Sequence, residues 1–250
     1  MELTSEEKNE LFERGFVKIP GVIPRAMVDG ALRAINHSLG NGMNVEDVPR
    51  MRSQSYCPEI QRTPVIADLY NETPARLLAE SVIGSEKIRP VTGGQIALRF
   101  PIATHPAPLA KPHLDGMYSP MNGVPAGTIQ NFTALLGVML SDLPYPDSGN
   151  LSVWPGTHRM FEQYFREHTP QSLLEGMPPI PMPDPEQITG EAGDIVIAHY
   201  MLAHGVTPNG SPNVRYAIYF RLTHVNHDMQ KWESMTDIWQ EWDGMHASQR

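Results

Sequence analysis

Hydrophobic residues recur at helical spacing in the first third of the chain, and polar start and stop signals frame each run. Thr4 and Glu7 form a capping-box pattern, and the segment that follows ends at Gly15, so we predict a helix there. The stretch FVKIPGVI then alternates apolar and polar residues, as a half-buried strand does. A second helix is predicted over residues 24–40, where apolar residues return every three or four positions.

Two further helices follow from the same pattern. One is predicted in TPARLLAESVIG, between Thr73 and Gly84, whereas residues 41–64 have the mixed polarity of a loop. Near the C-terminus, large apolar residues fall at helical intervals and predict one helix that packs on the rest of the protein or contacts a second copy. These residues are Trp232, Met235, Trp239 and Trp242.

From residue 88 onward the pattern changes to short apolar runs separated by Pro, Gly and Asn. The runs have the length of strands: GGQIALRF, NFTALLGVML, LSVWPG, GDIVIAHYML and RYAIYFRL. Such a series is typical of a sandwich or jelly roll. We therefore expect a mainly β fold in one domain over residues 1–250, with a helical flank (1–87), a jelly-roll core (88–225) and a C-terminal helix (226–250).

Composition narrows the class of protein. A net charge of −9 argues against a nucleic-acid partner, because phosphate binding needs a basic face. The single cysteine, Cys57, forms no internal disulfide and favours a reducing compartment, and no apolar run is long enough to cross a bilayer. We expect a cytoplasmic monomer or homodimer that acts on a small molecule, with no membrane or nucleic-acid partner.

The first candidate for chemistry is the sequence HLD. In an extended segment, His113 and Asp115 point to the same side, so both side chains can bind one metal ion. The motif alone decides little, because a chain with 10 histidines often contains such a pair by chance.

A second candidate lies in GDIVIAHYMLAHGVTPN and the strand that follows it. A hairpin centred on Asn209–Gly210, or a longer symmetric loop, would place His204 opposite Arg215 on one face of a sheet. Arginine binds carboxylates through its planar fork of donors. The pair therefore predicts a metal ligand beside a site for an anionic small molecule.

His113, Asp115 and His204 together make the two-histidine, one-carboxylate ligand set of non-haem Fe(II) oxygenases, which leaves three coordination positions open. A dicarboxylic keto acid fits two of them, with its far carboxylate on Arg215, and O₂ fits the third. His199 lies five residues before His204, and in a continuous strand that odd spacing would place it on the opposite face.

Four stretches, in order, resemble the phytanoyl-CoA dioxygenase (PhyH) family of Fe(II)/2-oxoglutarate-dependent oxygenases. They are FERGFVKIPGVIP, HLD, DSGNLSVWPGTHR and GDIVIAHYMLAHGVTPN. The resemblance implies a double-stranded β-helix in which His113, Asp115 and His204 bind iron. It also implies that Arg215 binds the far carboxylate of 2-oxoglutarate and that Arg99 lies near this cosubstrate. Because Asp115 is retained, the resemblance is to the family's oxygenases and not to its halogenases.

The function implied is a dioxygenase that hydroxylates or otherwise oxidises a small metabolite with Fe(II), 2-oxoglutarate and O₂, and releases succinate and CO₂. Met117 and Tyr118 are candidate substrate contacts, and the loops at 116–129 and 170–187 are candidate closing elements. Two alternatives stay open: a cupin-like metal enzyme that uses no keto acid, and a non-catalytic jelly-roll binding protein.

Overall fold

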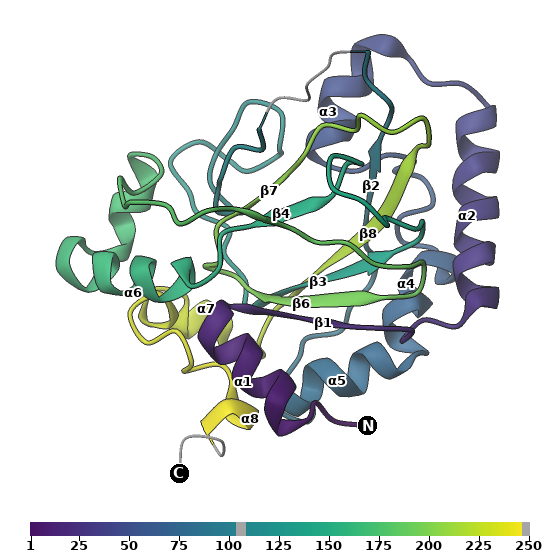
Figure 1. Ribbon diagram of the computed structural model, residues 1–250. Helices are drawn as coiled ribbons and strands as arrows, with labels where there is room; N and C mark the ends of the chain where they lie inside the picture. The colour runs from purple at the N-terminus through teal and green to yellow at the C-terminus, as the bar shows by residue number, and fades with distance from the viewer. Residues whose placement is uncertain (104–108, 247–250) are drawn as a thin grey trace.

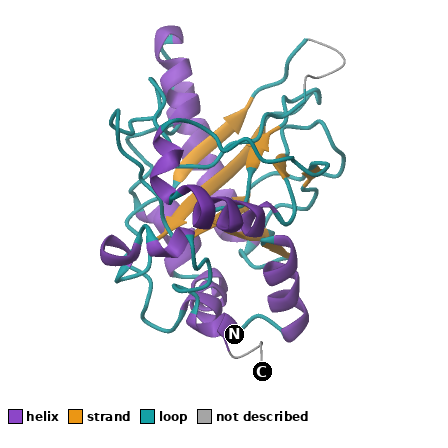
Figure 2. Cartoon of the chain, turned by 90° about the vertical axis from the view of Figure 1, so that its left-hand side faces the viewer, coloured by secondary structure: helices purple, strands orange, loops and turns teal. Residues whose placement is uncertain are grey.

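The computed structural model describes residues 1–103 and 109–246, and it places two β-sheets at the centre with helices around them (Figure 1). Figure 2 shows the strands enclosed by helices and long loops. The expected mainly β architecture with flanking helices agrees with this arrangement. No helix among the described residues is long and apolar enough to span a membrane.

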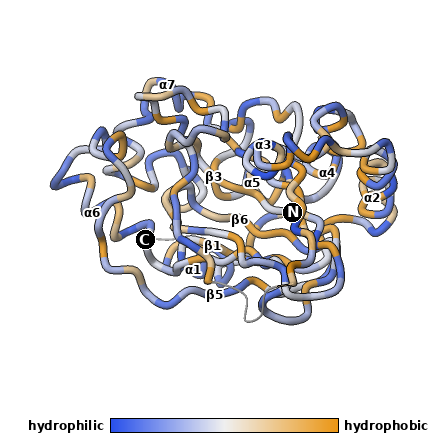
Figure 3. The backbone as a smooth tube through the Cα atoms, turned by 90° about the horizontal axis from the view of Figure 1, so that it is seen from above, coloured by the Kyte–Doolittle hydropathy of each residue, from blue (hydrophilic) through white to orange (hydrophobic). Residues whose placement is uncertain are grey.

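The larger sheet has five antiparallel strands in the order β1-β6-β3-β8-β2. Its members are β1 (Phe16–Ile19), β2 (Gln95–Arg99), β3 (Ala134–Met139), β6 (Ile195–His199) and β8 (Arg215–Leu222). The two strands β3 and β6 are buried along their whole length, which explains why both have continuous apolar sequences. Figure 3 shows hydrophobic stretches on these central strands and hydrophilic stretches in the outer segment around α6 (Thr157–His168).

The smaller sheet has three strands in the order β5-β4-β7. They are β4 (Leu151–Val153), β5 (Glu186–Gln187) and β7 (His204–Val206). All pairings within it are antiparallel. The segment from β4 to β5 contains α6 and the short helix η2 (Pro170–Leu174), which the apolar pattern does not predict.

The N-terminal helices form where the sequence predicts them. They are α1 (Ser5–Arg14), α2 (Arg25–Gly40) and α5 (Pro74–Ile83), joined by α4 (Pro64–Asn71) between the last two. In α1 the capping box is present, and the helix ends at Gly15 with φ 83°. The hydroxyl of Thr73 accepts a hydrogen bond from the Ala75 N–H at the start of α5.

The prediction of a loop over residues 41–64 is wrong in part. Two short helices, η1 (Val45–Asp47) and α3 (Val48–Ser53), lie within this range. Neither helix contains a buried residue, so there is no apolar stripe for a periodic pattern to reveal.

The C-terminal segment forms three short elements instead of one helix: α7 (His227–Gln230), η3 (Glu233–Met235) and α8 (Asp243–His246). Two of its tryptophans pack on residues outside the segment: Trp239 stacks on Phe12 at 5.2 Å between ring centroids, and Trp242 stacks on His199 at 5.3 Å.

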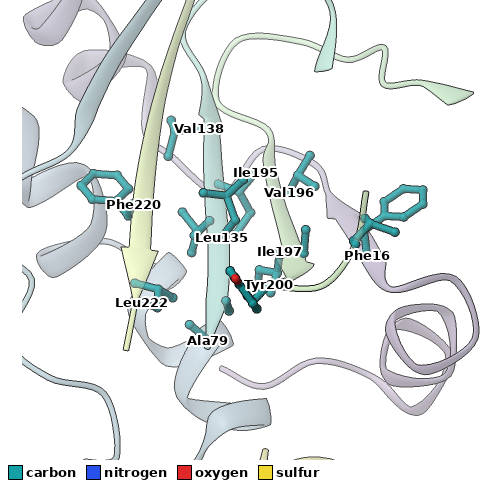
Figure 4. Packing of buried hydrophobic residues seen from close by; sticks show 14 of the residues in the cluster. Phe16, Ala79, Leu135, Val138, Ile195, Val196, Ile197, Tyr200, Phe220 and Leu222 are labelled. Atoms are coloured by element: carbon teal, nitrogen blue, oxygen red, sulfur yellow. The ribbon is translucent and has the colours of Figure 1, made fainter. Parts of the chain in front are cut away.

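Alternate residues of the larger sheet face two different environments. On one face, Phe220 of β8 contacts Tyr70 of α4 with 5.8 Å between ring centroids. Leu222, two residues further along β8, and Ala79 of α5 belong to the same buried cluster (Figure 4). The opposite face carries the residues that pair with Gln95 and Ala97 of β2, namely Tyr219 and Ala217. This second face lines a cavity between the two sheets.

Candidate metal centre

Backbone pairing brings the two predicted histidine ligands together. His113 and His204 form an isolated antiparallel bridge in which each N–H donates to the other's carbonyl, at 2.9 Å and 3.1 Å. Because Asp115 follows His113 by two residues, its side chain lies on the same side. Two segments that are 91 residues apart therefore present three ligating side chains at one point.

The three side chains fit a divalent metal. The Nε2 atoms of His113 and His204 lie 3.5 Å and 3.6 Å from Oδ1 of Asp115. One ligand atom from each residue lies within 4.8 Å of the others. Three ligand atoms that lie this close together would be able to hold one divalent ion. Two imidazoles and one carboxylate form the donor set that suits Fe(II).

Hydrogen bonding fixes the orientation of the His204 ring. Its Nδ1–H donates to the Leu202 carbonyl at 3.0 Å, which leaves the Nε2 lone pair directed at the metal position. Burial alone lowers the pKa of His204, but hydrogen bonding to Asp115 and the charge of that carboxylate raise it overall. The ring therefore lies in a site where the Asp115 carboxylate favours positive charge.

Arg221 holds the other oxygen of the candidate carboxylate ligand. Its Nη2 and Nε donate to Oδ2 of Asp115 at 2.8 Å and 3.1 Å, and its Nη1 donates to the Gln95 side chain at 3.0 Å. Burial alone would raise the pKa of Asp115, but the Arg221 guanidinium and the two imidazoles hold it well below its usual range. The arginine leaves Oδ1 free and keeps the carboxylate ionised.

The metal position opens into a cavity of about 530 Å³. Its walls come from β2, β3, β8, β4, β7, helix α3, the loop at 116–129 and the segment at 170–187, which the sequence predicts as a loop but which contains η2 and ends in β5. Met117 and Tyr118, the candidate substrate contacts, both line it, and Met177 reaches it from the Pro- and Met-rich loop. Trp154, in contrast, is buried in the core and does not line the cavity.

His204 and Arg215 lie in different sheets, so the predicted hairpin pairing is wrong. His204 belongs to β7, which pairs with β4, whereas Arg215 begins β8 of the larger sheet. The segment between them crosses from one sheet to the other, and it contains two prolines, which cannot donate to a hairpin ladder. Asn209 fixes this crossing by donating its side-chain amide to the Arg99 carbonyl at 2.8 Å.

Arg215 is nevertheless directed between the sheets with unused hydrogen-bonding capacity. It is 2% exposed, and it donates from Nε to the Gly149 carbonyl at 2.7 Å and from Nη1 to the Ala97 carbonyl at 3.0 Å. Its Nη2 has no hydrogen-bond partner in the described part of the chain. A buried charged donor without a partner is costly, so this atom marks a position for an anion.

Arg99 lies directly opposite Arg215 in the β2–β8 register, and it lines the main cavity. Burial and the neighbouring Arg215 charge lower the pKa of Arg99 to about 10, so this guanidinium stays charged at neutral pH. Arginine keeps its charge even when buried, so Arg215 is charged as well. Within residues 1–103 and 109–246, neither arginine has an acidic partner within ion-pair distance.

Arg215 itself lines a smaller cavity of about 20 Å³, which shares Leu151 and Tyr219 with the main one. Gly149 makes the close approach of the two arginines possible. Its φ is +79°, and a Cβ there would lie 2.9 Å from the Cβ of Arg99.

The sequence analysis does not identify two residues of the site, Arg221 and Tyr219, although their spacing in the sequence indicates them. Arg221 and Tyr219 lie six and four residues after Arg215 in the same strand, so alternation places all three on one face. The Tyr219 ring occupies the space beside Gly137, where a Cβ would lie 2.9 Å from the ring. The same period-two rule that links His113 with Asp115 would have found them.

His199 is separate from the metal centre, but for a reason that differs from the predicted one. It ends β6, and a turn lies between it and β7, so the two histidines are not in one continuous strand. One ring nitrogen, Nε2, lies 2.8 Å from the Ile238 carbonyl, and burial lowers the pKa of His199 to about 4. It is a neutral core residue beneath the C-terminal tryptophans.

A comparison of the sequence with models of protein families finds a match. Residues 12–217 match the family model described as Phytanoyl-CoA dioxygenase (PhyH). No curated protein sequence matches the chain.

Several solved structures share the fold. The non-haem alpha-ketoglutarate-dependent carbocyclase SnoK from nogalamycin biosynthesis is 21% identical with a TM-score of 0.57, over 92% of this chain and 91% of its own. HygX from Streptomyces hygroscopicus, with nickel and 2-oxoglutarate bound, is 18% identical with a TM-score of 0.60, over 90% and 88%. The alpha-ketoglutarate-dependent epimerase SnoN is 21% identical with a TM-score of 0.56, over 87% and 82%.

Proposed function

Because this chain belongs to the phytanoyl-CoA dioxygenase (PhyH) family, we propose that it oxidises a small-molecule metabolite at a centre made of His113, Asp115 and His204. The enzyme class follows from the family: it is a non-haem Fe(II)- and 2-oxoglutarate-dependent dioxygenase. The observation that carries the proposed site is the convergence of these three side chains, from two distant segments, at one edge of the cavity.

In this proposal the two imidazole Nε2 atoms and Oδ1 of Asp115 hold Fe(II). When bound together with 2-oxoglutarate and O₂, the iron would supply the oxidising power that converts the cosubstrate to succinate and CO₂, with one atom of O₂ entering succinate and the other going to the substrate. The pair of hydrogen bonds from Arg221 keeps Oδ2 of Asp115 away from the metal. The carboxylate would then bind through Oδ1 alone, and the three protein ligands would leave room at the metal for the keto acid and O₂.

Arg215 and Arg99 would bind the distal carboxylate of 2-oxoglutarate. Arg215 offers the unpartnered Nη2, and Arg99 presents a second charge on the same face of the sheet. Both are charged before the ligand arrives, so no proton transfer is needed for binding. Tyr219 and Leu151 border both cavities and lie where the carbon chain of the keto acid would pass.

Substrate would enter beside the 116–129 loop, where Met117 and Tyr118 form part of the wall. We propose that this loop and the 170–187 segment exclude water from the reacting centre. Hydroxylation is the simplest outcome, and related oxidations are also consistent with the site, since SnoK and SnoN are named as a carbocyclase and an epimerase. We propose that the residues of the cavity contribute to the reaction by orienting the substrate toward the iron.

We further propose that residues 1–250 form one double-stranded β-helix domain with an N-terminal flank (1–87) and a core (88–225), acting in the cytoplasm as a monomer or homodimer. The opposed sheets support the fold, and the absence of a possible internal disulfide supports the location.

An anaerobic titration tests the function. Fe(II) and 2-oxoglutarate added to the protein should produce a weak visible charge-transfer band, and Asp115→Ala should abolish it. A cupin-like enzyme without a keto acid would bind the metal but give no band, and it would leave the unpartnered Arg215 donor without a purpose. A non-catalytic binding protein would release no succinate when O₂ is admitted.

A further inference from the structure

The cavity is strongly cationic, although the whole chain has a net charge of −9. Three arginines line it, namely Arg52, Arg99 and Arg221, and Arg215 lies just behind the wall. Asp115 is the single carboxylate among the described lining residues. A dianionic cosubstrate does not neutralise four guanidiniums and a divalent metal, so the loaded site keeps a surplus of positive charge.

Arg52 is the arginine that the cofactors leave unused. Arg221 is already paired with Asp115, and the Arg99–Arg215 pair matches the distal carboxylate of 2-oxoglutarate. Arg52 lies on α3 at the mouth of the cavity, is exposed, and makes no hydrogen bond or ion pair with a described residue. Its free guanidinium fork suits a carboxylate or a phosphate.

The wall around Arg52 is preorganised. The side chain of Gln54, just after α3, donates to the Met121 carbonyl at 2.9 Å, which ties the helix to the neighbouring loop. Within that loop, the Asn122 amide donates to the Met117 carbonyl at 2.7 Å, and its oxygen accepts from two backbone N–H groups at 3.1 Å. The backbone position of α3 relative to this loop is therefore set before a ligand binds.

The rest of the lining is partly apolar. The contributing side chains come from both sheets and both loops: Leu114, Met117, Leu135, Leu151, Met177 and Val206. A molecule that fills this space has an apolar body next to the metal and an anionic group near α3.

From this arrangement we infer that the substrate is a small amphipathic molecule with a carboxylate or phosphate group, which Arg52 binds at the cavity mouth. The inference rests on the proposed function, because it assigns the remaining space of the same site to the substrate. It names the class of molecule that the enzyme oxidises and the residue that selects it.

The test uses the protein loaded with Fe(II) and excess 2-oxoglutarate under anaerobic conditions, with hexanoate, hexyl phosphate, hexanamide and hexylamine as probes. Binding is measured by calorimetry and by perturbation of the visible band. We expect at least one of the two anions, hexanoate and hexyl phosphate, to bind at least about fivefold more tightly than the neutral amide. Hexylamine should bind weakest. The two anions distinguish a carboxylate site from a phosphate site.

Arg52→Gln should remove most of this preference, whereas Arg50→Gln should retain it. Arg50 is the matched control, because it lies on the same helix, pairs with Asp47 at 3.0 Å and does not line the cavity. The affinity for 2-oxoglutarate is measured for each variant, so that a general effect on the cosubstrate is recognised.

Four results would overturn the inference: no anion binding at millimolar concentration, equal binding of anion and amide, an unchanged preference in Arg52→Gln, or displacement of 2-oxoglutarate by the anions. If the visible band never forms in the starting protein, the proposed function fails before the substrate class is tested.

Discussion

Arg215 provides the sharpest test of how this site binds a keto acid. The change Arg215→Met keeps an unbranched apolar stem and removes the guanidinium, which is 2% exposed and therefore little screened by water. One or two charge-assisted hydrogen bonds to a carboxylate contribute about 2–3 kcal/mol, so the Kd for 2-oxoglutarate should rise about 30- to 150-fold. Arg99 stays in place opposite, which is why we do not expect a larger loss.

The assay is an anaerobic titration of the Fe(II) protein, followed by the visible charge-transfer band. Removal of Arg215 also leaves the Gly149 and Ala97 carbonyls without a donor, so stability will fall as well. A thermodynamic cycle separates the two effects: 2-oxopentanoate, which has a methyl group where the distal carboxylate would be, is titrated against both proteins. It should bind wild type and Arg215→Met with similar affinity. Equal losses for both ligands, or a 2-oxoglutarate Kd within threefold of wild type, would refute the assignment of Arg215.

Three other predictions follow from the same geometry. Asp115→Ala should abolish Fe(II) binding and succinate release, because it removes the carboxylate ligand; Asp228→Ala, at an exposed pair with Arg89, is the control, and metal content is measured after gel filtration. Gly137→Ala should push the Tyr219 ring, 2.9 Å from the added Cβ, and destabilise the fold by about 1–3 kcal/mol in urea unfolding; an unchanged midpoint would contradict this packing. Burial lowers the pKa of His199 from 6.5 to about 4, so the unfolded chain binds the proton more tightly and stability should fall as pH drops through this window, by about 3 kcal/mol for this residue. Urea unfolding at several pH values should show a smaller acid loss in His199→Phe, and an identical slope would count against the buried neutral ring.

Local signals in the sequence determine much of this protein. The capping box at Thr4, the helix stop at Gly15 and the cap at Thr73 each satisfy backbone groups within a few residues, so the sequence alone locates these helix ends. Period-two alternation likewise places His113 and Asp115 on one side of the chain. Together with the family resemblance, these signals suffice to name the three residues that meet at the candidate centre.

The remaining features of the fold and the site depend on pairing between segments that are far apart in the sequence. His204 joins β4 and not β8, although β8 follows it directly in the chain, because the partner of a strand is selected by packing across the whole sheet. The C-terminal tryptophans do not share one helix, and the rings of Trp239 and Trp242 pack on Phe12 and His199, which lie far away in the sequence.

Arg221 reaches Asp115 from 106 residues away, and Arg52 acquires its position only because α3 closes one side of the cavity. A local pattern specifies how a segment folds and which way its side chains point. It does not specify which distant segment lies opposite, because that depends on the burial of apolar surface by the whole chain.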